Sequence, residues 1–199
     1  SYCNLAEGQS GYANLAFLKS VRCIDGKPYT ASTVAGKDSW ALEDMIKTRD
    51  SRFEATFWDE PYSGGTSIYC VKFIDRVGPT YTLTGAARPA KYGSMTNTNG
   101  YPVIRYAEVL LNYAEAKQEL ALSYSGSPVT QADIDATINV IRNRPIAPEA
   151  AAKGVQKTAP LIISDIADDP MRTSSAYALT HAGVVSDPLL WEIGQGRRR

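Results

Sequence analysis

The sequence is poor in the residues that build metal sites and disulfide frameworks. Its 199 residues include three cysteines, Cys3, Cys23 and Cys70, and a single histidine, His181. An odd, widely spaced set of cysteines without a Cys-x-x-Cys pair predicts no disulfide framework, and one histidine cannot supply a metal cluster. We therefore expect no metal and no other cofactor, and we interpret Cys3 as incidental rather than as a lipid anchor.

An excess of charge and long apolar runs are also lacking. Lys and Arg number 21, as do Asp and Glu, so the formal net charge is zero. Bulk charge therefore gives no attraction to nucleic acid or to an anionic membrane. No apolar run reaches the about 18 residues that a membrane-spanning helix needs, and no signal-peptide pattern opens the chain. Both ends read as cut within a pattern, so we expect a fragment or a trimmed chain.

The strongest pattern present is a helix over residues 101–120. Pro102 suits a first helical turn, where its missing N–H costs nothing. Ile104, Ala107, Leu111 and Ala114 recur at helical spacing, and the small alanines would let a second helix approach closely. This pattern indicates a helix packed in an array of helix pairs.

Further helices are predicted on either side. The helix that follows residues 101–120 begins at Thr130, which forms a capping-box-like start with Asp133. It ends before Pro145. Together with residues 101–120 it forms a helical hairpin. Residues 10–21 and 38–48 also have helical patterns, and Asp187 is expected to cap a last helix. We divide the chain into residues 1–100, a loop- and strand-containing part, and residues 101–199, a helical part of the same domain.

Alternating residues predict a small β insertion. Phe53, Ala55 and Phe57 alternate with polar residues, which predicts a strand over residues 52–58, and residues 66–74 predict a second strand. The segment between them is rich in Pro, Ser and Gly, which favours a turn. Residues 78–100 are expected to form a long loop. The predicted fold class is therefore mainly α, with a small strand and loop insertion.

Several segments, taken in order, resemble the SusD-like (RagB/SusD) family. They are Asp25-Gly26-Lys27-Pro28, the TRDSRF run at 48–53, the helix at 101–120 with Arg105, Ala107-Glu108, Leu111-Asn112 and Ala114-Glu115-Ala116, the INVIRNR run at 138–144 followed by Pro148, and residues 190–198. The resemblance covers most of the chain and would make it the C-terminal portion of such a protein.

The resemblance implies a function and a location. Family members are non-catalytic, lipid-anchored proteins on the surface of the Bacteroidetes outer membrane, built on tetratricopeptide-like helix pairs. They bind glycans or other nutrients and sit as a lid on a SusC-like TonB-dependent transporter. We accordingly expect an oligosaccharide or polysaccharide ligand, the transporter as protein partner, and no enzyme activity.

Glycan binding calls for aromatic rings against the apolar sugar face and polar groups for the hydroxyls. The best local set is Trp58 and Tyr62, with Asp59 and Glu60, where the first predicted strand ends. Tyr92 and Asn97 in the predicted loop form a second set. For each of these rings the alternative is a role in packing, and Trp40 and Trp191 are expected in the core.

Other interpretations remain open at this point. Arg105, Glu108, Asn112 and Glu115 could form a recognition stripe. We favour a solvated or paired face, in which Arg105 pairs with Glu108 and partners such as Arg142 or Arg144 fix helix against helix. The adjacent Asp59 and Glu60 would point to opposite faces of a strand, which argues against a glycosidase. A helical-repeat module that binds proteins, and a peptide rather than glycan nutrient, are the alternative functions.

Overall fold

The computed structural model describes residues 15–57, 68, 70–73, 75–93, 96, 100, 102–172 and 187–197. Helices dominate these residues, which confirms the mainly α prediction. They are α1 Leu15–Ser20, α2 Leu42–Thr48, α3 Gly78–Thr84, α4 Tyr106–Tyr124, α5 Gln131–Ala136, α6 Ile138–Arg142, α7 Pro148–Ala152 and α8 Pro188–Arg197, with 3₁₀ turns η1 Ala90–Tyr92, η2 Ile163–Asp165 and η3 Pro170–Arg172. No helix among the described residues is long and apolar enough to span a lipid bilayer.

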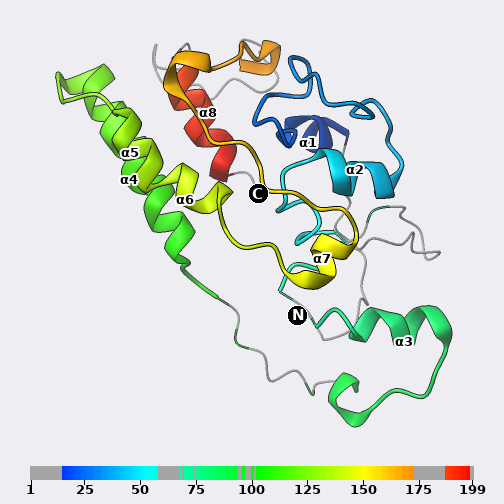
Figure 1. Ribbon diagram of the computed structural model, residues 1–199. Helices are drawn as coiled ribbons and strands as arrows, with labels where there is room; N and C mark the ends of the chain where they lie inside the picture. The colour runs from blue at the N-terminus through cyan, green and yellow to red at the C-terminus, as the bar shows by residue number, and fades with distance from the viewer. Residues whose placement is uncertain are drawn as a thin grey trace.

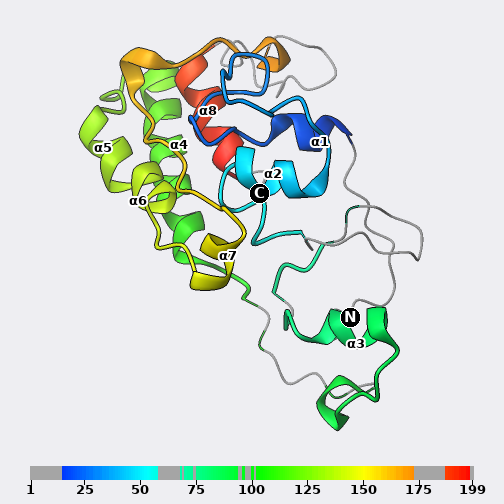
Figure 2. The same ribbon diagram turned by 45° about the vertical axis from the view of Figure 1, so that its right-hand side comes forward.

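The longest helix, α4, packs against the α5–α6 pair and against α8 (Figures 1 and 2). This group forms the larger core, made of Leu111, Ala114, Val129, Ile134, Ile138, Ile141, Leu161, Leu189 and Ile193. Ala114 is fully buried, and a Cβ added at Gly196 of α8 would lie only 2.8 Å from Leu111 Cδ2. The predicted close approach of a second helix is therefore confirmed, and the helix that approaches is α8.

The helix α4 begins later than predicted, at Tyr106. Arg105 is the N-cap residue in an extended conformation, with φ −122°. Pro102 therefore precedes the helix instead of lying in its first turn. Val103 and Ile104 are 84% and 72% exposed, so they do not extend the buried stripe. The proline fixes only its own φ, and it does not commit the following residues to a helix.

The second helix of the predicted hairpin is divided in two. Thr130 caps α5 through the predicted capping box, which Asp133 completes. Ile134, Ile138 and Ile141 are all buried, as their spacing predicts. Thr137 nevertheless leaves the helical region, with φ −124° and ψ −86°. Its hydroxyl donates to the Asp133 carbonyl at 2.6 Å, a bond that bends helices.

The two predicted strands are wrong for the residues that the structure describes. Residues 51–56 form turns, and the Phe57 N–H donates to the Phe53 carbonyl at 3.0 Å. The rings of Phe53 and Phe57 lie 4.9 Å apart and both are buried, whereas Ala55 is exposed. Spacing of four residues suits a helical turn as well as an alternating strand. What remains of the pairing is one antiparallel bridge between Phe57 and Cys70.

The remaining boundaries differ in smaller ways. Residues 78–100, predicted as a loop, contain α3 and η1, and Figures 1 and 2 show these elements standing apart from the helical core. The helix α2 begins at Leu42, after an N-cap at Ala41 that makes no side-chain capping bond. The predicted cap at Asp187 is confirmed, since its carboxylate accepts from the Leu190 N–H at 2.7 Å.

A second core lies under α1, α2 and α7. It contains Leu18, Val21, Met45, Ile46, Phe53, Phe57, Ala150 and Val155. The helix α7 falls in a segment that lacks a periodic pattern, and Pro148 at its start supplies the fixed φ that a first turn needs.

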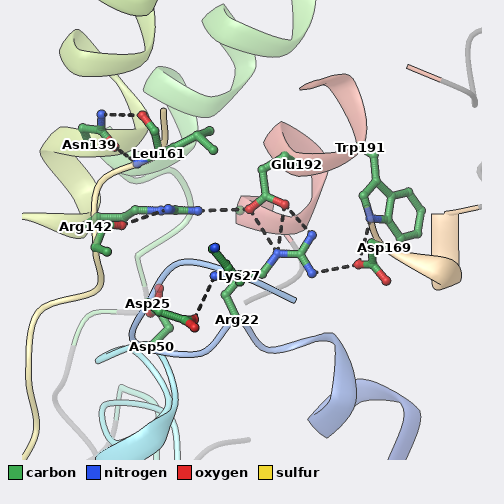
Figure 3. Close-up of polar contacts among 12 residues, drawn as sticks. Arg22, Asp25, Lys27, Asp50, Asn139, Arg142, Leu161, Asp169, Trp191 and Glu192 are labelled. Carbon is green, nitrogen blue, oxygen red and sulfur yellow. Dashed lines mark hydrogen bonds and ion pairs between the residues drawn. The ribbon is translucent and has the colours of Figure 1, made fainter. Parts of the chain in front are cut away.

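Buried charges connect the two cores (Figure 3). Glu192 on α8 accepts hydrogen bonds from Arg22 and Arg142, at 2.9 Å from Arg22 Nε and 3.0 Å from Arg142 Nη2. Arg22 also donates to Asp169 at 2.8 Å, and Asp169 accepts from the Trp191 indole at 3.0 Å. All five side chains are at most 5% exposed. The sequence pairs Arg142 with the polar face of the 101–120 helix, but the carboxylate that it contacts is Glu192 on α8.

Two arginines and two carboxylates make this group electrically neutral. Burial alone would lower the pKa of Arg22, but the carboxylates of Glu192 and Asp169 outweigh burial and raise it. Burial lowers the pKa of Arg142 despite the nearby carboxylate of Glu192. The pair Arg22–Glu192 joins residues 1–100 to residues 101–199 through the interior of the molecule.

Candidate functional site

Three of the four predicted ligand-binding residues, Trp58, Tyr62 and Asn97, lie outside the described residues, and their ligand contacts stay predictions. The fourth, Tyr92, is 1% exposed. Its hydroxyl donates to Asp75 at 2.7 Å, and its ring lies 5.2 Å from that of Tyr81. The Val77 backbone N–H and this hydroxyl hold the pKa of Asp75 below its usual value. Tyr92 therefore packs η1 against residues 75–81 of the same polypeptide, and no face of its ring is open for stacking.

A concavity lies elsewhere, beside the N-terminal end of α4. It is a cleft of about 540 Å³, within the range of small-ligand sites. The turn at 52–56, the segment at 72–73, the start of α4 and the ends of α6 and α8 surround it. Its lining residues are Arg52, Ala55, Thr56, Lys72, Phe73, Pro102, Val103, Arg105, Ala107, Glu108, Leu111, Ile141, Arg144 and Gly196.

Phe73 supplies an aromatic ring to this cleft. The side chain is 42% exposed, and its backbone has φ 67°. A bulky residue in this left-handed region is strained, and such strain concentrates at functional sites. Lys72 Nζ lies 5.3 Å and Arg105 Cζ lies 5.1 Å from the ring centroid. Both cations therefore lie close to the ring, and Arg105 does not form the predicted pair with Glu108.

The cleft is electropositive. Arg52 is neutralised by Asp50, with Nε 2.8 Å from Oδ1. Within the described part of the chain, by contrast, no carboxylate lies at ion-pair distance from Lys72, Arg105 or Arg144. Burial, followed by the positive charges of Arg105 and Arg52, holds the pKa of Lys72 below its usual value.

The helix α4 adds to this field, because the positive end of its dipole lies at the cleft. Glu108, in the first turn of α4, is the single carboxylate among the described lining residues. Acid–base hydrolysis of a glycosidic bond uses two carboxylates across the scissile bond. The arrangement instead suits non-covalent binding, with a ring for an apolar face and cations for anionic or hydroxyl groups.

A second aromatic pair is exposed on another part of the molecule. Trp40 precedes α2 instead of lying within a helix, and it is 38% exposed, so its predicted place in the core is wrong. Its ring lies 5.3 Å from that of Tyr29, and the Arg49 guanidinium lies within 5.5 Å of both rings. Trp191, by contrast, is buried in α8 as predicted.

Comparison with known proteins identifies the family. A family model described as the SusD family matches residues 59–198, which is more than two thirds of the chain and includes most of the cleft lining. No curated protein and no solved structure matches the chain. The SusD family consists of non-catalytic proteins that bind glycans and other nutrients at the cell surface. On the strength of this match, the chain belongs to the SusD family.

Proposed function

We propose that this protein captures an oligosaccharide or polysaccharide nutrient at the cell surface and delivers it to a SusC-like TonB-dependent transporter. It acts without catalysis, on tetratricopeptide-like helix pairs, and a lipid anchor holds the full-length protein on the outer membrane. Membership of the SusD family is the observation that carries this proposal. Residues 1–100 and 101–199 act as one domain, and the buried pair Arg22–Glu192, which joins them, supports this view.

The cleft beside α4 is the proposed place of capture. Phe73 offers a ring for the apolar face of a sugar, and Arg105 and Lys72 offer donors for its oxygens. Trp58, Tyr62 and Asn97 remain proposed additional contacts. Binding would rest on stacking and hydrogen bonds, both of which discriminate between sugars when water is excluded.

Two alternatives lead to different expectations. A module that binds proteins through helical repeats would use a smooth concave helical face, whereas the cleft has an aromatic and charged lining. A receptor for peptide nutrients could use the same cleft, and direct binding measurements separate it from a glycan receptor.

The test is affinity gel electrophoresis of the protein with a panel of polysaccharides, joined to an oligosaccharide array and a peptide array. We expect retardation by at least one glycan. Phe73→Ala should abolish it, whereas the matched variant Trp40→Ala should retain it, because Trp40 lies outside the cleft. Circular dichroism of both variants checks that they fold. Binding of peptides without binding of any glycan would refute the glycan proposal, and loss of binding only in Trp40→Ala would refute the assignment to the cleft.

A further inference from the structure

The cleft has more positive charge than capture of a neutral sugar requires. Its described lining contains four basic side chains and one acidic side chain, although the whole chain has zero net charge. Asp50 neutralises one of the four, Arg52. Three basic side chains then remain in the described lining, Lys72, Arg105 and Arg144. The one acidic side chain in that lining is Glu108.

These three cations come from distant parts of the sequence and meet in one place. Lys72 follows the bridge at Cys70, Arg105 caps α4, and Arg144 follows α6. Lys72 and Arg105 share the ring of Phe73 as a neighbour, so their charges lie close together. Gathering like charges raises the free energy of the empty cleft, and an anionic ligand would remove that cost.

We propose that the cleft selects acidic oligosaccharides, whose carboxylate or sulfate groups pair with Lys72, Arg105 and Arg144 while a sugar ring lies on Phe73. This inference rests on the proposed function and narrows its ligand class. The two arginines present planar forks that match a carboxylate or a sulfate, and the half-buried Lys72 supplies a point charge beside the ring. A neutral sugar would cover the same ring but leave all three cations without a counter-charge.

The aromatic ring of Phe73 favours an acidic sugar over a polyanion that has no apolar ring face. The Phe73 ring centroid lies 5.1 Å from Arg105 Cζ and 5.3 Å from Lys72 Nζ, so an apolar surface adjoins both charges. A ligand that satisfies both kinds of group carries its negative charge on a ring with an apolar face, as an acidic sugar does. An acidic peptide would satisfy the charges without covering the ring.

The test uses two pairs of ligands, each with a charged form and its neutral partner on the same sugar backbone. Calorimetry would compare a galacturonic acid tetramer, its methyl ester, a sulfated galactan tetramer and the desulfated galactan. We expect at least one acidic form to bind about tenfold or more tightly than its neutral partner, the effect of roughly one charge-assisted hydrogen bond. The carboxylate and sulfate arms identify which acid the cleft takes. Raising the salt concentration should weaken only the acidic ligands.

Matched variants place the effect in the cleft. Lys72→Gln should weaken the acidic ligand about tenfold and leave its neutral partner unchanged, and the exposed Arg144→Gln should act in the same direction with little risk to folding. Lys47→Gln removes a cation of α2 that does not line the cleft, and it should alter neither affinity.

Equal affinity for acidic and neutral partners would overturn the charge selectivity and leave glycan capture standing. A poly-glutamate peptide that binds as tightly as the acidic tetramer, with the same loss in Lys72→Gln, would overturn the sugar requirement. Absence of binding to every glycan, with retained binding of peptides, would instead refute the proposed function itself.

Discussion

Replacing Glu192 by Gln should remove a large part of the stability of this protein. Glu192 accepts hydrogen bonds from Arg22 at 2.9 Å and from Arg142 at 3.0 Å, and all three side chains are at most 5% exposed. The substitution leaves two buried arginines facing one carboxylate, Asp169. Breaking a buried ion pair in this way costs about 3–5 kcal/mol, against a total free energy of unfolding of about 5–15 kcal/mol.

Urea unfolding followed by Trp191 fluorescence would measure this loss, because Trp191 is buried beside the substituted residue. The matched control is Asp168→Asn, which removes an exposed ion pair with Arg172 and should change the free energy of unfolding by about 0–1 kcal/mol. A loss below about 1 kcal/mol in Glu192→Gln would refute the reasoning that Glu192 compensates both arginines.

Charge balance provides a second check if Glu192→Gln does not fold. The double variant Glu192→Leu with Arg142→Met removes one charge of each sign and leaves Arg22 paired with Asp169. Replacement of a buried ion pair by apolar residues of similar volume is often neutral or stabilising. We therefore expect the double variant to fold and to be more stable than Glu192→Gln. A double variant that is less stable would show that geometry, not charge, dominates.

Three further predictions concern the scaffold. Burial would raise the pKa of Asp169, but hydrogen bonds from Arg22 and Trp191 outweigh burial and lower it. The stabilising effect of Asp169 is therefore complete above about pH 4 and is lost as the pH falls. In urea unfolding, the difference in free energy of unfolding between wild type and Asp169→Asn should shrink below that pH. Gly194→Ala, with open space around its Cβ, should raise the melting temperature by restricting the unfolded chain, whereas Gly196→Ala, which meets the α4 leucine at 2.8 Å, should lower it. Asn139→Asp loses the amide donor to the 161–163 segment and should cost about 1–3 kcal/mol by urea unfolding, whereas Asn143→Asp at an exposed position should cost little.

The helical scaffold could be predicted from the sequence because its signals are local. The capping box of Thr130 with Asp133 and the buried spacing of Ile134, Ile138 and Ile141 depend on residues within three or four positions of one another. The helix α3 could have been found in the same way. Pro at its first turn and Gly85 at its end, with φ 67°, are standard boundary signals within the predicted loop.

The cleft could not be predicted because its residues are distant in sequence. Alternation predicts two strands that contain Arg52 and Phe73, and it does not reveal the turn that brings Phe53 and Phe57 together. The sequence pattern pairs Arg105 with Glu108, three positions along the chain, and nothing in the sequence places it near Phe73. The prediction for Trp58 and Tyr62 rests on their residue types and their place in a turn, which carry no information about what lies opposite them.

The link between Arg22 and Glu192 has a consequence for how the protein is made. The two residues are 170 positions apart, so at synthesis rates of about 5–20 residues per second Arg22 waits roughly 10–30 s for its partner to be synthesised. Until α8 leaves the ribosome, burying Arg22 would strand an uncompensated cation. The early helices α1 and α2 cannot close over it during that time. A growing chain therefore stays open to chaperones or proteases until α8 arrives, and premature termination before α8 should yield a product that is degraded instead of accumulating.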